Sequence, residues 1–555
     1  MSKAAQFVEK HKATLDKAAD AAFARGYWSK YPEMPSGKVY GETAKEDGEA
    51  AFKGYMNTAF ALDVPGASGT VGAEHSPFGF DLGITYPKAT IDGVIAAAEA
   101  ARKGWRQASA LERAAVCVEI LDRINKRSFE MAFAVMHTTG QAFMMAFQAG
   151  GPHAQDRGLE AVTYAYLAQK QAPADEVIWE KPQGKNPPIV MKKRFHIAPR
   201  GISVMVGCAT FPTWNGYPGL FASLATGNPV IVKPHPNAIL PLALSVKIAR
   251  EVLTEAGFDP NLVILAADDA NAPITKDLCL RPEVKIIDFT GSSTFGNWLE
   301  ENCRQAQVYT EKAGVNFVII ESTDDFKGMI RNLSFTLSLY TGQMCTTTQN
   351  IFIPKDGIDT DQGHKSFAEV SQALADGVTK FLSDTDRAVE VLGAVGSPAT
   401  LERLASAPKS GEVVLESQAL KHPYLSNAVV RTPAIVKLDK SMEKVYCEEC
   451  FGPVSYVIPV DSGMDAIETA KRTVMQHGAI TAGLYSNKPE IIDAAIDACI
   501  DAQVALSVNL TGGVFVNQTA AFSDFHATGG NPAANASLTD YAFVANRFSI
   551  VGVRM

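Results

Sequence analysis

The sequence has few features of secreted, membrane or nucleic-acid-binding proteins. Its 555 residues include only eight cysteines, scattered from position 117 to position 499, which do not form a disulfide framework. No apolar run is long enough to span a bilayer, and Lys3, Glu9 and Lys10 interrupt any signal-peptide core. The net charge is only −9, without a long run of Lys or Arg. We therefore expect a cytoplasmic protein that acts on a small molecule, with neither nucleic acid nor a membrane as a partner.

The chain is too long for one ordinary domain, and its 46 % hydrophobic residues can bury a large core. Residues 1 to about 60 and 90–143 show helical patterns, and from residue 201 onward short apolar runs alternate with helical segments. Such alternation predicts parallel βαβ units, whose ligands bind at the carboxyl ends of the strands. The expected strands include ISVMVG, PVIVKP, LVIL, VKIIDFT, NFVII, NIFIP and AIVKL, with a loop at 208–219 and helices at 220–226 and 240–256.

Cys345 is the candidate nucleophile. It lies in YTGQMCTTTQNIFI, residues 340–353, where Gly342 lets the backbone approach a ligand and the following threonines keep the turn polar. A free cysteine is also often a small buried residue without a chemical role, so this stretch alone leaves both readings open.

Three further stretches suggest a shared site. TEKAGVN, residues 310–316, places Glu311 at 345 − 311 = 34 residues before the thiol, and EECFGPV occupies residues 448–454. FTGSSTFG, residues 289–296, comes where a strand passes into a helix, whose N–H groups and dipole can hold a pyrophosphate. The motif around Gly342, Gln343 and Cys345, the Glu311 motif and the acidic–Phe–Gly–Pro motif, in their order and with the 34-residue separation, resemble the aldehyde dehydrogenase superfamily from about residue 199 to residue 517.

The resemblance implies an α/β fold of the aldehyde dehydrogenase type, with two parallel-sheet domains, one for the cofactor and one for catalysis, plus a β-flap for oligomerisation. The expected boundaries are 1–310 for the helical extension and dinucleotide-binding domain, 311–517 for the catalytic domain and 518–555 for the return segment. The flap would combine a hairpin at about 176–198 with a closing strand from YAFVANRFSIVGV at 541–553 in a homodimer or homotetramer. An ordinary surface hairpin is the alternative.

The resemblance also implies roles for individual residues. Cys345 would be the nucleophile and Glu311 the base. Thr210 stands where the family has an oxyanion-binding asparagine, with Asn215 as a possible substitute. The implied cofactor contacts are Lys233, Gly291, Ser292, Gly296, Glu449 and Phe451. No metal site is expected, because the CxxC at Cys447 and Cys450 has no second Cys/His pair at a zinc spacing.

Position 236 bears on the choice of cofactor. NAD-preferring members usually carry a glutamate two positions beyond Pro234, and this chain has Pro236. A carboxylate there would repel a 2′-phosphate, so its absence favours NADP, with NAD as the alternative.

The expected function is NAD(P)-dependent oxidation of an aldehyde to an acid through a cysteine thioester. Chain length, the helical start, GCATFPTWNGYPG and NPVIVKPHPNAILP resemble the phenylacetic acid degradation (PaaN-type) branch, which implies a ring-opened, CoA-linked semialdehyde of aromatic catabolism. Two alternatives stay open. One is a CoA-acylating dehydrogenase, and the other is a catalytically weak homologue that acts as a binding or assembly subunit.

Overall fold

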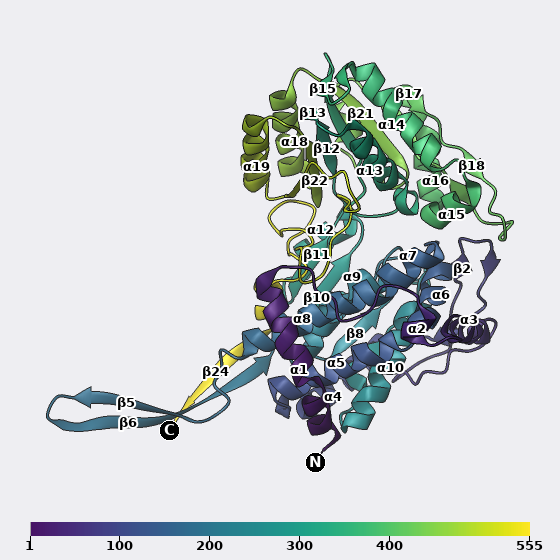
Figure 1. Cartoon of the computed structure of the whole chain (residues 1–555). Coiled ribbons are helices and arrows are strands. Elements are labelled where there is room, and N and C mark those ends of the chain that lie inside the picture. Colours follow the sequence, from purple (N-terminus) through teal and green to yellow (C-terminus); the bar gives the residue numbers. More distant parts are fainter. Residues whose placement is uncertain (1) are drawn as a thin grey trace.

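The computed structural model describes residues 2–555, which form two α/β lobes and a projecting β-arm (Figure 1). The first lobe contains a five-stranded sheet in the order β11-β10-β7-β8-β9, and all four neighbouring pairs are parallel. The apolar runs form these strands because both faces of the sheet are covered. The strands are β7 (Ile202–Val206), β8 (Val230–Lys233), β9 (Val263–Leu265), β10 (Val284–Thr290) and β11 (Gln307–Glu311).

Helices surround this sheet, and the extension at the N-terminus adds α1 against α5 and α8 (Figure 1). The helices of this lobe are α1 (Lys3–Ala24), α2 (Gly37–Tyr40), α3 (Ala44–Tyr55), α4 (Ile91–Gln107), α5 (Ala110–Asn125), α6 (Ser128–Thr139), α7 (Phe143–Gln148), α8 (Ala154–Gln169), α9 (Pro212–Ala225), α10 (Leu240–Ala256), α11 (Thr275–Cys279) and α12 (Ser293–Asn302). Four two-residue strands, β1 (Thr70–Val71), β2 (His75–Ser76), β3 (Phe80–Asp81) and β4 (Tyr86–Pro87), join α3 to α4.

The second lobe is built on a seven-stranded sheet in the order β17-β20-β21-β14-β12-β22-β23. Only the β17 pairing is antiparallel. The strands are β12 (Phe317–Ile320), β14 (Asn350–Pro354), β17 (Glu412–Leu415), β20 (Ala434–Lys437), β21 (Val454–Val460), β22 (Thr481–Tyr485) and β23 (Ala505–Val508). The helices are α13 (Phe326–Ser338), α14 (Phe367–Phe381), α15 (Thr385–Leu392), α16 (Pro398–Ser406), α17 (Glu443–Tyr446), α18 (Gly463–His477) and α19 (Pro489–Ala502). Shorter strands are β13 (Ser322–Thr323), β15 (Ile358–Thr360), β16 (Gly363–Lys365), β18 (Ala419–Leu420) and β19 (Val430–Arg431).

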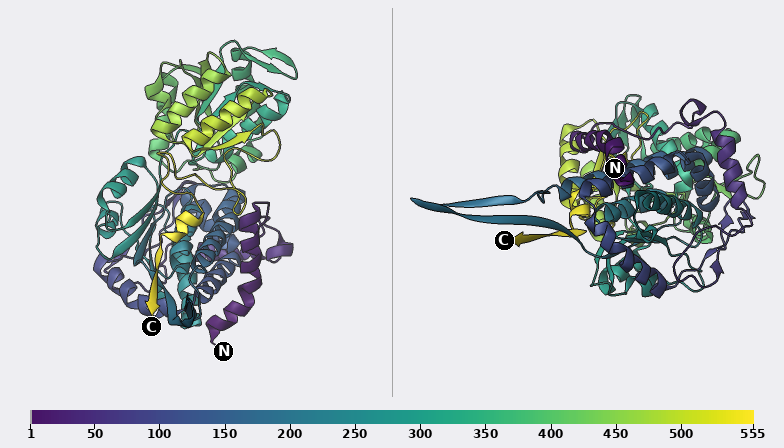
Figure 2. Two further views of the ribbon diagram at one scale, coloured as in Figure 1. Left: turned by 90° about the vertical axis from the view of Figure 1, so that its left-hand side faces the viewer. Right: turned by 90° about the horizontal axis from the view of Figure 1, so that it is seen from below.

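The arm is a three-stranded antiparallel sheet that extends away from the first lobe (Figures 1 and 2). It comprises β5 (Val177–Gln183), β6 (Asn186–Pro199) and β24 (Phe548–Arg554), with β24 pairing along β6 from Phe548 opposite Pro199 to Arg554 opposite Lys193. The expected closing strand at 541–553 is therefore wrong in its first part. Tyr541–Ala545 forms helix α20, because the Asp540 carboxylate accepts a hydrogen bond from the Phe543 N–H at 2.8 Å and caps the turn.

The expected loop at 208–219 is also corrected. Helix α9 begins at Pro212, not at residue 220. Proline is tolerated at the first helical position, where its missing N–H has no intrahelical partner to lose. The early start places Asn215 on a helix whose first turn lies beside the carboxyl end of the first sheet.

The N-terminal segment reaches a loop near the other end of the chain. The Trp28 ring packs edge-on against Phe522 with centroids 4.8 Å apart, and the Arg25 guanidinium lies 3.6 Å from the centre of the Phe525 ring. The Ser523 hydroxyl donates to the Arg25 carbonyl at 3.4 Å across 498 residues of sequence. The first thirty residues thus hold a loop that belongs to the return segment.

All eight cysteines are free thiols. Across residues 2–555, no helix is both long and apolar enough to cross a membrane.

Candidate active site

The turn that carries Cys345 has an unusual backbone. Tyr340, Thr341 and Gly342 have φ values of 51°, 50° and 62°, all in the left-handed region. Non-glycine residues lose about 1–2 kcal/mol each in this conformation. Buried hydrogen bonds hold the turn, because the Tyr340 hydroxyl donates to the Thr139 carbonyl at 2.5 Å and the Thr341 hydroxyl to the Leu392 carbonyl at 2.7 Å. Strain held in this way commonly accompanies a functional site.

The segment after the thiol is fixed by one asparagine. The Asn316 amide donates to the carbonyls of Cys345 and Thr347 at 2.8 and 3.0 Å. Its carbonyl accepts from the backbone N–H groups of Ile480 and Thr481 at 2.9 and 3.0 Å. Asn316 therefore locks the nucleophile segment against strand β22.

Gly342 is required for both conformation and space. A Cβ at this position would lie 2.3 Å from the Gly452 carbonyl oxygen, in addition to the cost of positive φ. We expect Gly342→Ala to lower stability by about 1–3 kcal/mol and to reduce activity, since the turn must shift. Thermal denaturation and aldehyde turnover measure these effects.

Gly184→Ala is the matched control, because Gly184 has φ of 64° and a Cβ there would meet nothing within 4 Å. Gly184→Ala has the cost of a positive φ but no steric clash. Equal losses in both variants would show that the close approach to Gly452 has no effect.

Cys345, Glu311 and His526 meet at the junction of the lobes. Their side-chain ligand atoms all lie within 4.8 Å of one another. Glu311 ends strand β11, and Cys345 follows α13 in the second lobe. His526 belongs to the return segment, with Nε2 3.2 Å from Glu311 Oε1 and 3.8 Å from Cys345 Sγ. The structure thus brings together Cys345 and Glu311, two of the three residues expected to be catalytic, and places His526 beside them.

The ionisation of Glu311 and Cys345 is coupled. Burial alone raises the pKa of Glu311, but attraction to His526 and hydrogen bonds from its neighbours hold that pKa below the ordinary value. Burial first, and then the Glu311 carboxylate, act to raise the pKa of the Cys345 thiol. A carboxylate beside the thiol therefore opposes thiolate formation unless positive charge is also present.

Asn215 takes a position that the sequence left undecided. Its amide Nδ2 donates to Glu311 Oε2 at 3.1 Å, and its Oδ1 lies 3.7 Å from Cys208 Sγ. Thr210 uses its backbone carbonyl to accept from Gln141 Nε2 at 2.7 Å. Within residues 2–555, its hydroxyl makes no hydrogen bond to Cys345 or Glu311. The Asn215 side chain therefore contacts the proposed base Glu311, and the Thr210 side chain does not.

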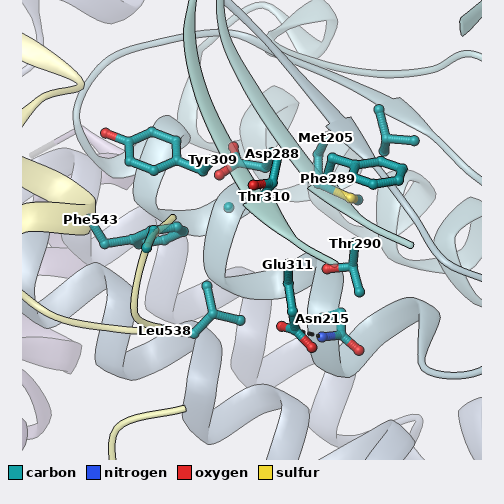
Figure 3. Close-up of a pocket in the computed structure, with 13 residues that line it drawn as sticks. Met205, Asn215, Asp288, Phe289, Thr290, Tyr309, Thr310, Glu311, Leu538 and Phe543 are labelled. Atoms are coloured by element: carbon teal, nitrogen blue, oxygen red, sulfur yellow. Dashed lines mark hydrogen bonds between the residues drawn. The ribbon is translucent and has the colours of Figure 1, made fainter. Parts of the chain in front are cut away.

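A cavity of about 20 Å³ borders Glu311 (Figure 3). Asn215 and Thr290 lie at the Glu311 end, and Asp288 and Tyr309 lie at the other (Figure 3). One water needs roughly 10–15 Å³ in a polar cavity. The cavity therefore has room for a water molecule beside the proposed base.

The acidic–Phe–Gly–Pro motif is joined to the nucleophile segment by Gln349. Its amide donates to the carbonyl of Glu448 at 3.0 Å, and its carbonyl accepts from the N–H of Cys450 at 2.6 Å. Arg403 holds the next residue through the Phe451 carbonyl at 2.9 Å. Glu449 is half-buried, and burial raises its pKa to about 7, while the Gly314 N–H reaches Oε1 at 3.4 Å. The motif is thus placed next to the glutamate turn.

Lys233 is buried at the end of β8 with a carboxylate partner. Its Nζ lies 2.7 Å from Asp268 Oδ1 and also donates to the Pro234 carbonyl at 2.7 Å. Burial lowers the pKa of Lys233, and Asp268 opposes that shift. Asp268, which follows the neighbouring strand, is thus the carboxylate partner of Lys233.

The expected phosphate loop opens helix α12. Ser292 caps this helix by accepting from the Phe295 N–H at 3.4 Å, so first-turn N–H groups stay free of intrahelical partners. A Cβ at Gly296 would meet the Lys312 stem at 2.6 Å, and the Lys312 ammonium donates to Asn297 Oδ1 at 2.8 Å. Gly296 therefore makes room for the Lys312 side chain.

Two residues of the site were not predicted from the sequence. His526 lies in FSDFHATGG, which matches no catalytic spacing, and Asp268 lies in a polar loop after a strand. An acidic residue at a strand end was a weak signal for Asp268, and no local signal pointed to His526.

The two α/β lobes, the arm and the thiol turn define an α/β protein with a cysteine site at the junction of its lobes. The sequence model described as the aldehyde dehydrogenase family matches residues 85–533, so the chain belongs to that family. A crystal structure of an NAD-dependent aldehyde dehydrogenase from Burkholderia multivorans matches with a TM-score of 0.98 at 56 % identity, covering 100 % of this chain and 99 % of that chain. The predicted superfamily and fold class are confirmed.

Two curated relatives are more distant. Over 417 residues the chain is 25 % identical to 4-trimethylaminobutyraldehyde dehydrogenase B of Danio rerio, covering 72 % of this chain and 74 % of the relative. Over 329 residues it is 25 % identical to 3,4-dehydroadipyl-CoA semialdehyde dehydrogenase of Aromatoleum evansii, covering 54 % of this chain and 58 % of the relative.

Proposed function

We propose that this chain oxidises an aldehyde to a carboxylic acid through a thioester on Cys345. The observation that carries the proposal is the meeting of Cys345, Glu311 and His526 within 4.8 Å at the junction of two lobes. The sulfur attacks the carbonyl carbon, and the oxygen becomes an alkoxide. A bound nicotinamide dinucleotide would supply the acceptor for the hydride of this carbon.

The residues of this chain fit such a cofactor. Gly291 and Ser292 would meet its phosphates at the start of α12, and Lys233 with Asp268 would meet a ribose at the β8 end. Glu449 and Phe451 would lie at the other end, beside the glutamate turn. These roles, like those of Thr210 and Gly296, are proposals.

Glu311 serves the second half of the reaction. It takes a proton from water, the hydroxide attacks the thioester, and the acid leaves as the sulfur is released. Acylating relatives commonly lack this glutamate and use CoA as the acyl acceptor. Its presence within reach of the thiol, beside a cavity large enough for a water, supports an acid product.

We also propose that the substrate is a ring-opened, CoA-linked semialdehyde of phenylacetate or related aromatic catabolism, as in the PaaN-type branch. The A. evansii relative, whose name specifies a CoA-linked semialdehyde substrate, supports this choice. A panel of aldehydes and acyl-CoA semialdehydes, followed by absorbance of the reduced cofactor, tests it. We expect the highest kcat/KM for a CoA-linked semialdehyde.

Product analysis separates the alternatives. Turnover that requires free CoA and yields a new thioester would identify a CoA-acylating enzyme. Dinucleotide binding without turnover of any aldehyde would identify the binding or assembly subunit.

We propose NAD as the cofactor. Asp268 supplies the carboxylate that Pro236 does not, and a carboxylate repels a 2′-phosphate. The NADP preference expected from Pro236 stays a prediction that the same measurement tests. We expect a higher kcat/KM with NAD than with NADP, and Asp268→Asn should shift that ratio toward NADP by about tenfold, or 1.4 kcal/mol.

Asp269→Asn is the matched control, because Asp269 is the exposed neighbour of buried Asp268. A higher kcat/KM with NADP in the unmodified protein would restore the earlier expectation. In that case Pro236→Glu should move the preference toward NAD.

The remaining assignments concern assembly. We propose that residues 1–310 form the extension and dinucleotide-binding domain, 311–517 the catalytic domain and 518–555 the return segment. We further propose that the arm joins a homodimer or homotetramer. Exposed apolar side chains on all three of its strands support this, among them Ile178, Val190 and Val551. A cytoplasmic location also stays a proposal.

A further inference from the structure

His526 is a buried histidine that the proposed reaction has not yet used. Its side chain is 2 % exposed, and Nδ1 lies 3.4 Å from the Thr519 hydroxyl oxygen. The Trp214 ring covers it edge-on with centroids 4.7 Å apart. Only Nε2 faces the reacting groups, at 3.2 Å from Glu311 and 3.8 Å from Cys345.

The contact with Glu311 fixes where one proton lies. A nitrogen lone pair and a carboxylate oxygen repel at 3.2 Å unless a hydrogen lies between them. Because the Glu311 pKa is lowered, its carboxylate is ionised at neutral pH and accepts from Nε2–H. The Thr519 hydroxyl can accept a second proton donated by Nδ1, so both ring nitrogens have partners as donors.

The loop is built to keep this ring in place. His526 and Leu538 exchange two backbone hydrogen bonds of 2.9 Å each. Phe522 and Ala527, on either side, have φ values of 63° and 61°, a conformation that costs a non-glycine residue about 1–2 kcal/mol. Arg157 holds the loop through the Asp524 carbonyl at 3.0 Å. Backbone strain is thus sustained on both sides of His526 by surrounding contacts.

We propose that His526 is a catalytic residue of this site: as an imidazolium, it shares its Nε2–H between Glu311 and Cys345 and stabilises the thiolate that attacks the aldehyde. Glu311 beside the thiol favours neutral sulfur, and the cation reverses that balance. The carboxylate then holds the imidazolium in place and stays unprotonated for the thioester step.

The protons balance. Cys345 releases its S–H proton to water and His526 takes one up from water at Nδ1, because Nδ1 faces Thr519 and not the thiol. The pair thus changes from neutral to zwitterionic without net loss. The sulfur uses its electron pair to bond to the aldehyde carbon, and the carbonyl π pair moves to oxygen. After hydrolysis the sulfur leaves as thiolate, and the imidazolium is still beside it.

Alkylation of Cys345 by iodoacetamide tests the thiolate without substrate or cofactor. In the unmodified protein we expect the rate to rise with pH about a midpoint at least one unit below that of a free thiol, about 8.5. In His526→Asn that midpoint should rise by one unit or more, which is roughly a tenfold slower reaction near pH 7. Peptide mass spectrometry assigns the reaction to Cys345.

Other groups act on this titration. They are Glu311 on β11, Cys208 and Glu449 around the thiol, and Arg157 on α8, whose guanidinium lies 5.4 Å from the Trp214 ring. Glu311→Gln distinguishes activation of the thiol by His526 from direct proton uptake by Glu311. If Glu311 itself accepted the thiol proton, alkylation would be slower in that variant. His422→Asn, a buried histidine in the second lobe, is the matched control.

A raised midpoint in His526→Asn but not in His422→Asn supports the proposal. An unchanged midpoint in His526→Asn, or slowing in Glu311→Gln alone, would overturn it. If His526→Asn fails to fold, the alkylation midpoints of Thr519→Val and of the unmodified protein test the proposal instead. We expect a smaller rise in Thr519→Val, and a midpoint at or above about 8.5 in the unmodified protein overturns the proposal.

This inference rests on the proposed function, because it takes Cys345 as the nucleophile. The two fail in distinguishable ways. A low alkylation midpoint without turnover of any aldehyde rejects the function and keeps the activated thiol. Aldehyde turnover with a midpoint at or above about 8.5 rejects the role of His526 alone.

Discussion

Cys345→Ala is expected to abolish aldehyde turnover, lowering kcat by roughly 10⁴-fold or more, because it removes the sulfur that forms the thioester. The alanine removes only the sulfur, and the turn is held by Tyr340, Thr341 and Asn316 through contacts that do not involve it. Dinucleotide binding should therefore persist. Steady-state kinetics and fluorescence titration with the dinucleotide measure the two properties.

Cys447→Ala is the matched control. This half-buried thiol contacts Thr473 at 3.7 Å in the second lobe and has no place in the proposed reaction. Ordinary turnover in Cys345→Ala would show that the nucleophile lies elsewhere.

Glu311→Gln is expected to separate the two halves of the reaction. Thioester formation should proceed once, since it depends on the thiol and the hydride acceptor, but hydrolysis loses its base. General-base assistance is typically worth about 10²–10⁴-fold, so a burst of reduced cofactor close to the enzyme concentration should precede a slow steady phase. Rapid-mixing absorbance records both phases.

The shape of that trace locates the role of Glu311. Loss of the burst would place Glu311 in thiol activation, which also contradicts the assignment of that task to His526. An unchanged steady rate would remove Glu311 from the mechanism. A steady rate restored only by added CoA would identify CoA as the acyl acceptor.

Local patterns predicted most of the two sheets. β8 follows the apolar PVIVKP run, and α10 spans the predicted residues 240–256 before Gly257 ends it with φ of 85°. These elements were predictable because a short buried strand or an amphipathic helix is decided by neighbouring residues. Helix α9 begins at Pro212, before the predicted start at residue 220. Proline at the first position of a helix loses no hydrogen bond.

The site was predicted only where a motif lies on one short stretch. Cys345 and Glu311 carried such motifs, whereas the contact between Asp268 and Lys233 joins the ends of two strands. The contact between His526 and Glu311 spans 215 residues. Pairings of this kind depend on how the lobes and the return segment pack, and no local pattern encodes that. The direction of the Asn215 amide was undecided for the same reason.

The docking of Arg25 and Trp28 on the loop at 522–525 sets an order for biosynthesis. The ribosome makes Arg25 498 residues before Ser523, its partner in this contact. A nascent chain already contains the thiol and the carboxylate but cannot place the imidazole between them. Under the role proposed for His526, a chain that has not yet gained this loop would carry an unactivated thiol, and the reactive cysteine would arise only once the loop has docked.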